Sequence, residues 1–152
     1  MATPAIALES LTLNVIDEIH VAAPPEATFA ALLEQLGPYS EHPDGTPMQM
    51  KLEPWPGGRW FRDLGDNNGH FWGVVQAIKS PTLLEITGPL FMSYPVACNV
   101  QYRLSEEPGG TVIKFHHSAF GLIQDEHRRG VTKGWSHIHS RAKARAEGKG
   151  KK

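Results

Sequence analysis

Residues 95–120 have the sequence PVACNVQYRLSEEPGGTVIKFHHSAF, which contains the clearest strand pattern of the chain. Apolar and polar residues alternate in both halves, with the period of two that is typical of a strand with one buried face. The alternating positions are Val96, Cys98, Val100, Tyr102 and Leu104 in the first half, and Ile113, Phe115 and His117 in the second. Pro108-Gly109-Gly110 between the halves indicates a tight turn. The segment therefore predicts two antiparallel strands, 95–106 and 111–120.

The segments before this pair follow similar rules. Residues 11–21 alternate as a half-buried strand, and Ala23-Pro24-Pro25-Glu26 then predicts a helix start, because proline and an acid are favourable in the first turn. The buried stripe of this helix is Phe29, Leu32, Leu33 and Leu36, and Gly37-Pro38 ends it. Further strands are expected at 48–52, 59–64, 69–80 and 82–87, with a turn at 65–68 whose residues suit positive φ.

The chain closes with a long helix that we expect to begin near Gln124-Asp125. Val131, Trp135, Ile138 and Ala142 are spaced so that they share one face of it. The order of elements is thus a strand, a helix, about six strands and a long helix, without repeats or a linker. This order predicts a two-layer α+β domain in which the last helix lies across an antiparallel sheet.

Composition limits the classes of protein to consider. The chain has 152 residues, 40% of them hydrophobic and 20% charged, which is typical of one globular domain. With Cys98 as the single cysteine, no internal disulfide forms, and the first ten residues lack the features of a signal peptide. No apolar run approaches the ~20 residues that span a bilayer. We therefore expect a cytoplasmic protein.

Charge is distributed unevenly along the chain. Residues 128–152 carry a net charge of +8, whereas the rest of the chain carries −9. The end of the basic segment has no aromatic residue for base stacking, so no nucleic-acid partner is expected. The expected organisation is a flexible N-terminus at 1–10, a single domain at 11–142, and a basic tail at 143–152 that is disordered or a frayed helix end.

Three short motifs carry a family resemblance. They are IHVAAPPEATF at 19–29, LEPWPGGRW at 52–60, and GVVQAI at 73–78 followed by Pro81 and Leu84. Together with Gly134-Trp135 on the last helix, their order resembles the START/Bet v 1-like superfamily (SRPBCC, the helix-grip fold). The branch that they resemble most is that of the homologues of the activator of heat shock protein 90 ATPase. The resemblance covers roughly residues 13–140.

The resemblance implies a helix-grip fold, in which a strongly curved antiparallel sheet of about seven strands wraps around the long C-terminal helix. It also implies an apolar pocket between sheet and helix. It does not imply one chemistry, because the superfamily includes lipid carriers, hormone receptors, polyketide cyclases and proteins that resemble co-chaperones.

Five aromatic residues are candidates for the wall of this pocket. Large rigid rings can shape a cavity, and Trp and Tyr add a polar atom that can orient a ligand. We expect Trp135 and at least two of the others to line one pocket; the alternative is an ordinary packed core. The candidates are Trp60, Trp72, Tyr102, Phe115 and Trp135, with His117 as an inward-facing histidine beside them.

The histidines suggest other possible roles for the site besides apolar binding. A buried His117 could bind a ligand carbonyl or act as an acid or base, or could be structural. A metal site is not expected, since His116 and His117 diverge on a strand and His137 and His139 lie about 200° apart around a helix. No cofactor motif or common catalytic signature is present.

The preferred function is binding of a small apolar or amphipathic molecule without catalysis. A first alternative is an enzyme of the cyclase or hydrolase kind that uses His117 with Asp63 or Glu53. A second is a module that interacts with a chaperone, as the resemblance suggests. Arg59 and Arg62 are either ligand anchors or exposed strand charges. The sequence leaves the oligomeric state and the identity of the ligand open.

Overall fold

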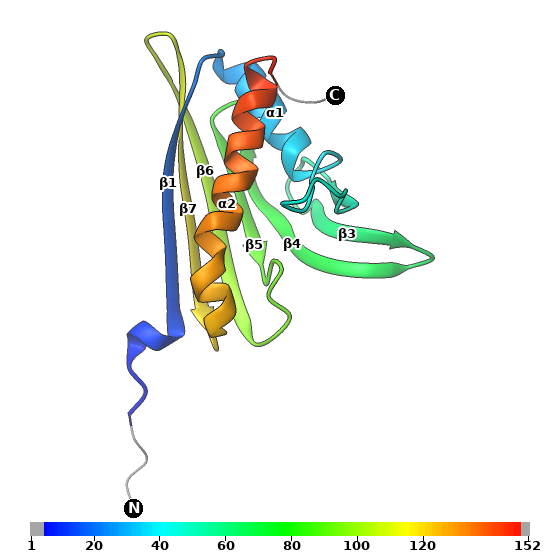
Figure 1. Cartoon of the computed structure of the whole chain (residues 1–152), viewed down its shortest axis with the longest axis vertical. Coiled ribbons are helices and arrows are strands. Elements are labelled where there is room, and N and C mark those ends of the chain that lie inside the picture. Colours follow the sequence, from blue (N-terminus) through cyan, green and yellow to red (C-terminus); the bar gives the residue numbers. More distant parts are fainter. Residues whose placement is uncertain (1–4, 150–152) are drawn as a thin grey trace, which may run out of the picture.

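The computed structural model describes residues 5–149, which form one sheet and two long helices (Figure 1). All neighbouring strands are antiparallel, and their order across the sheet is β1-β7-β6-β5-β4-β3-β2. In chain order the elements are a short 3-10 helix Leu8–Leu11, β1 Thr12–Val21, α1 Pro25–Leu36, β2 Met50–Leu52, β3 Arg59–Gly65, β4 Asn68–Lys79, β5 Leu83–Gly88, β6 Val96–Glu107, β7 Gly110–Gly121 and α2 Asp125–Ala146. The predicted sheet of about seven strands with a long C-terminal helix packed on it is confirmed.

The alternation in the sequence determines which face of each strand is buried. In β1, Leu13 and Val15 are buried while Asn14 and Ile16 are exposed. Val15 lies opposite His117 in β7, which in turn lies opposite Val100 in β6, so one row of inward side chains crosses three strands. The core therefore lies on the face of the sheet that the helices cover.

The long helix α2 packs on β1, β7 and β6. Val131, Trp135, His139 and Ala142 are its buried residues, and the Trp135 ring lies 4.8 Å from the ring of Phe115 in β7. Figure 1 shows α2 in front of β7 and β6, whereas β3 and the adjoining part of β4 run away from the helix. The candidate site is formed by α2, β4 and the loops that follow α1 and β5.

The two ends of the chain differ in how far the structure describes them. Residues 1–4 of the expected flexible N-terminus and residues 150–152 of the expected tail lie outside the described residues. The helix α2 continues to Ala146, past the expected domain boundary at Ala142. Beyond it, the Glu147 carboxylate accepts a hydrogen bond from the backbone N–H of Ala22, 2.7 Å away, and so connects the helix end to the start of α1.

Candidate functional site

An open pocket of about 620 Å³ lies beside the N-terminal part of α2. This volume is in the range of sites that hold small organic molecules. Its walls come from four separate parts of the chain: the loop after α1, β4, the loop between β5 and β6, and α2. They consist of Glu41, His42, Pro43, Met48, Trp72, Phe91, Glu126, His127, Gly130, Val131, Gly134, Trp135, His137 and Ile138.

Two glycines leave the α2 wall open. Gly130 and Gly134 are one turn apart on the pocket side, and a Cβ added at either position would meet nothing within 4 Å. Glycine inside a helix costs about 1 kcal/mol relative to alanine. Because neither glycine has a side chain, the surface of α2 that faces the pocket stays open at these two positions.

Aromatic rings form much of the apolar wall. Trp72 makes edge contacts with Phe91 at 5.8 Å and with Trp60 at 5.0 Å between ring centroids, and its indole N–H donates to His70 Nδ1 at 3.1 Å. Trp135 contributes the wall on the α2 side. These contacts fix the orientation of the Trp72 ring in the pocket wall.

The polar groups of the pocket lie along the loop after α1 and along α2. Glu41 accepts a hydrogen bond from Arg141 Nε at 2.9 Å and lies 3.9 Å from His137 Nε2. On the opposite part of the rim, His127 Nδ1 lies 2.9 Å from the Tyr94 hydroxyl. The pocket thus combines apolar walls with a small number of fixed polar groups, the usual composition of a small-molecule site.

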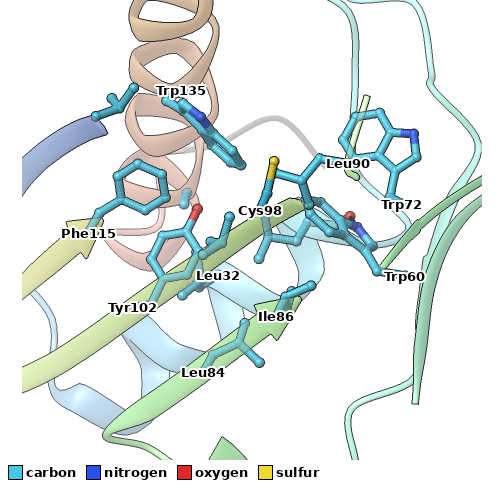
Figure 2. Close-up of a cluster of buried hydrophobic side chains, with 14 of the residues drawn as sticks. Leu32, Trp60, Trp72, Leu84, Ile86, Leu90, Cys98, Tyr102, Phe115 and Trp135 are labelled. Atoms are coloured by element: carbon cyan, nitrogen blue, oxygen red, sulfur yellow. Dashed lines mark hydrogen bonds between the residues drawn. The ribbon is translucent and has the colours of Figure 1, made fainter. Parts of the chain in front are cut away.

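The six predicted site residues are all buried, but they do not all share the pocket. Trp72 and Trp135 line it, whereas Trp60, Tyr102, Phe115 and His117 pack behind it. Of the aromatic residues expected at the wall, Trp135 and Trp72 line this pocket. Figure 2 shows Tyr102 and Phe115 near Trp135, and Trp60 near Trp72. The indole N–H of Trp60 donates to the Leu36 carbonyl at 2.8 Å, which directs that ring toward the end of α1.

His117 does not line the pocket, but it is hydrogen-bonded to the pocket residue Trp135. The indole N–H of Trp135 donates to His117 Nδ1 at 2.9 Å, so this nitrogen is an acceptor and the proton of the neutral ring is on Nε2. His117 Nε2 is buried and has no partner among the described residues. Burial lowers the pKa of His117 to about 4, with a smaller contribution from His116. The ring is therefore neutral at pH 7.

A second chain of hydrogen bonds, which joins the partly exposed Asp17 to the buried His139 and Tyr102, was not anticipated from the sequence. His139 Nδ1 lies 2.9 Å from Asp17 Oδ2, and His139 Nε2 lies 2.9 Å from the Tyr102 hydroxyl. Burial lowers the pKa of His139, while the bond to Asp17 and its charge oppose this change. Burial and the Asp17 charge raise the pKa of Tyr102 well above its ordinary value. The spacing of four residues from Trp135 was the signal that would have placed His139 on the buried face.

The acids that were considered as catalytic partners of His117 bind other residues. Asp63 pairs with Lys51 at 2.7 Å, and Glu53 accepts from Arg59 Nε at 2.9 Å. The hydrogen bonds from Arg59 lower the pKa of Glu53 to about 2. The Arg62 side chain donates to the Met48 carbonyl at 3.0 Å, so neither of the two arginines projects into the pocket wall.

Among residues 5–149, no group of three or more His, Cys, Asp or Glu side chains is arranged to hold a metal ion. Within the same range, neither helix combines the length and the apolar composition needed to cross a membrane.

Comparisons with known proteins agree with the resemblance seen in the sequence. Residues 22–147 match the family described as Activator of Hsp90 ATPase homolog 1-like protein. No match was found among curated protein sequences.

Solved structures share the fold at low sequence identity. Protein MLL2253 from Mesorhizobium loti has a TM-score of 0.67 at 20% identity, over 87% of this chain and 95% of that one. Ara h 8.0201 has a TM-score of 0.61 at 17% identity, over 90% and 96% of the two chains. The di-domain ARO/CYC protein StfQ from the steffimycin biosynthetic pathway has a TM-score of 0.63 at 16% identity, over 93% of this chain and 53% of that one. These similarities show a Bet v 1-like helix-grip fold.

Proposed function

The chain belongs to the Activator of Hsp90 ATPase homolog 1-like family, and from that premise we propose that it binds a small apolar or amphipathic molecule in the pocket beside α2. The observation that carries the proposal is the open helix face at Gly130 and Gly134, opposite the fixed ring of Trp72. A chain that needed only a packed core would gain helix stability from alanine at both glycine positions.

We propose binding without turnover. The ionisable groups of the interior, His117 and His139, lie behind Trp135 and outside the pocket wall. Their hydrogen-bond partners are Trp135 in one case and Asp17 with Tyr102 in the other. Acid–base catalysis needs a group within hydrogen-bonding reach of the reacting atom. The wall itself presents His127, whose Nδ1 lies 2.9 Å from the Tyr94 hydroxyl, and we assign this histidine a role in binding. Ester hydrolysis by the parent protein that His117→Gln or His127→Phe abolishes, without loss of folding, would contradict this part of the proposal.

The binding proposal is tested with Nile red, a neutral apolar dye whose fluorescence rises in an apolar site. Gly134→Leu places a large side chain in the pocket, and we expect its affinity for the dye to fall at least about tenfold, equivalent to roughly 1.4 kcal/mol. Ser136→Leu is the matched control, since Ser136 is exposed on α2 and outside the pocket wall. This control should bind as the parent does.

Two outcomes would overturn the proposal. One is a parent protein that gives no saturable Nile red signal. The other is equal affinity of the parent and Gly134→Leu, because the dye would then bind elsewhere. Circular dichroism of the three proteins checks that each substitution leaves the fold intact.

A further inference from the structure

The His127 ring is held at the pocket rim by three contacts. Tyr94 stacks on it, with ring centroids 5.6 Å apart and planes 16° apart, and Phe91 contacts it edge-on at 5.1 Å. The Tyr94 hydroxyl also lies 2.9 Å from His127 Nδ1. An imidazole fixed in this way is suited to present one nitrogen in a constant direction.

The hydrogen bonds around Tyr94 identify that nitrogen. The Tyr94 oxygen accepts from the backbone N–H of Gln124 at 3.2 Å. Its own proton has no acceptor other than His127 Nδ1 among the described residues, and on that ground we assign the phenol as the donor to Nδ1. The neutral His127 ring then carries its proton on Nε2. Within residues 5–149 this Nε2–H has no protein acceptor, so it is a donor available to a pocket ligand.

The charges of the pocket add a second constraint. Two carboxylates, Glu41 and Glu126, belong to its wall, and no lysine or arginine does. Glu41 is already paired with Arg141, whereas Glu126 makes no ion pair within the described range. Because Glu126 precedes His127 in the chain, its negative charge would lie near an anion bound at His127.

Resting on the proposed function, we infer that the pocket selects a neutral apolar molecule with a hydrogen-bond-accepting oxygen, such as an aryl ketone or an ester. His127 Nε2 donates to that oxygen, and Trp72, Phe91 and Trp135 contact the apolar body. Glu126 disfavours the carboxylate or sulfonate counterparts of the same molecules. The pocket therefore distinguishes a carbonyl ligand from an anionic amphiphile.

The test compares two naphthalene probes at pH 8 and low ionic strength. Prodan is neutral and carries a ketone whose emission wavelength responds to hydrogen bonding, and 6-(p-toluidino)naphthalene-2-sulfonate (TNS) is anionic. We expect Prodan to displace Nile red and to bind at least about tenfold more tightly than TNS. His127→Phe, which keeps an aromatic ring, should weaken Prodan binding about 2- to 10-fold, the range for one lost hydrogen bond, and shift its emission to shorter wavelength.

Two variants complete the design. His116→Phe makes the same chemical change on the outer face of the sheet and should leave Prodan binding unchanged. Glu126→Gln should strengthen TNS binding and leave Prodan unaffected. The inference alone is overturned if Nile red binds but Prodan does not, if His127→Phe has no effect, or if TNS binds as tightly as Prodan. If none of the three dyes binds, this inference and the proposed function fall together.

Discussion

At the scale of single residues, burial keeps His117 neutral, and a hydrogen bond from Trp135 is compatible only with the form whose Nδ1 carries no proton. The indole of Trp135 can only donate, so it fixes His117 Nδ1 as an acceptor. A protonated His117 would have to lose this bond, and its second nitrogen is already buried without a partner among the described residues. Both effects favour the neutral ring, and the same ring supports the pocket wall from behind.

His117 should therefore make stability depend on pH. Its pKa is about 4 in the folded protein and about 6.5 when unfolded. Between these values the unfolded chain binds more protons, so acid favours unfolding. The contribution is fully present above pH 6.5, and about 3 kcal/mol of it is lost as the pH falls to 4.

Urea unfolding of the parent and of His117→Gln at pH 7.5 and pH 4 measures this effect. The variant should lose less stability on acidification than the parent does. His116→Gln, on the exposed face of the same strand, is the control and should follow the parent. Equal acid sensitivity of the parent and His117→Gln would contradict the assignment.

At the scale of elements, glycines have opposite roles in the helix and in a turn. Gly134 in α2 faces open space, whereas a Cβ at Gly58 would lie 2.0 Å from the Glu53 carbonyl oxygen. Gly58 belongs to the turn before β3, where its N–H donates to the Trp55 carbonyl at 2.8 Å. The glycine of the turn is thus required by backbone packing, and the glycine of the helix is not.

Alanine at these two positions should change stability in opposite directions. Gly134→Ala should raise the free energy of unfolding by about 1 kcal/mol, because alanine is the better helix former and its methyl group meets nothing. Gly58→Ala should lower it, since the backbone has to shift to relieve the contact. Thermal unfolding followed by circular dichroism measures both variants. A destabilised Gly134→Ala would show that the pocket side of α2 is filled by protein.

At the scale of the whole molecule, the fold could be predicted from the sequence and most of the site could not. Strands such as β6 and β7 were predictable because they alternate between a buried and a less buried face, as Val96 to Leu104 does along β6. The family resemblance is confirmed by the match over residues 22–147, and the turn expected at Pro56-Gly57-Gly58 lies directly before β3.

The pocket depends on information that periodicity does not contain. Its wall joins the loop after α1, the loop between β5 and β6, and α2, so residues such as Pro43, Phe91 and Gly130 meet only in the folded chain. Sequence patterns placed Tyr102, Phe115 and Trp135 on one buried face correctly. They could not show that Trp135 separates the other two from the pocket, because this depends on how α2 is rotated on the sheet.

The most direct test of ligand binding beside α2 is a methyl NMR titration of the protein with Nile red. Met48, Val131 and Ile138 line the pocket and provide methyl groups from two of its walls. The account predicts that their signals shift together and saturate at one ligand per chain, while those of the exposed Ile16 and Leu122 stay unchanged. Shifts confined to Ile16 and Leu122, or no saturable shift at the pocket methyl groups, would contradict it.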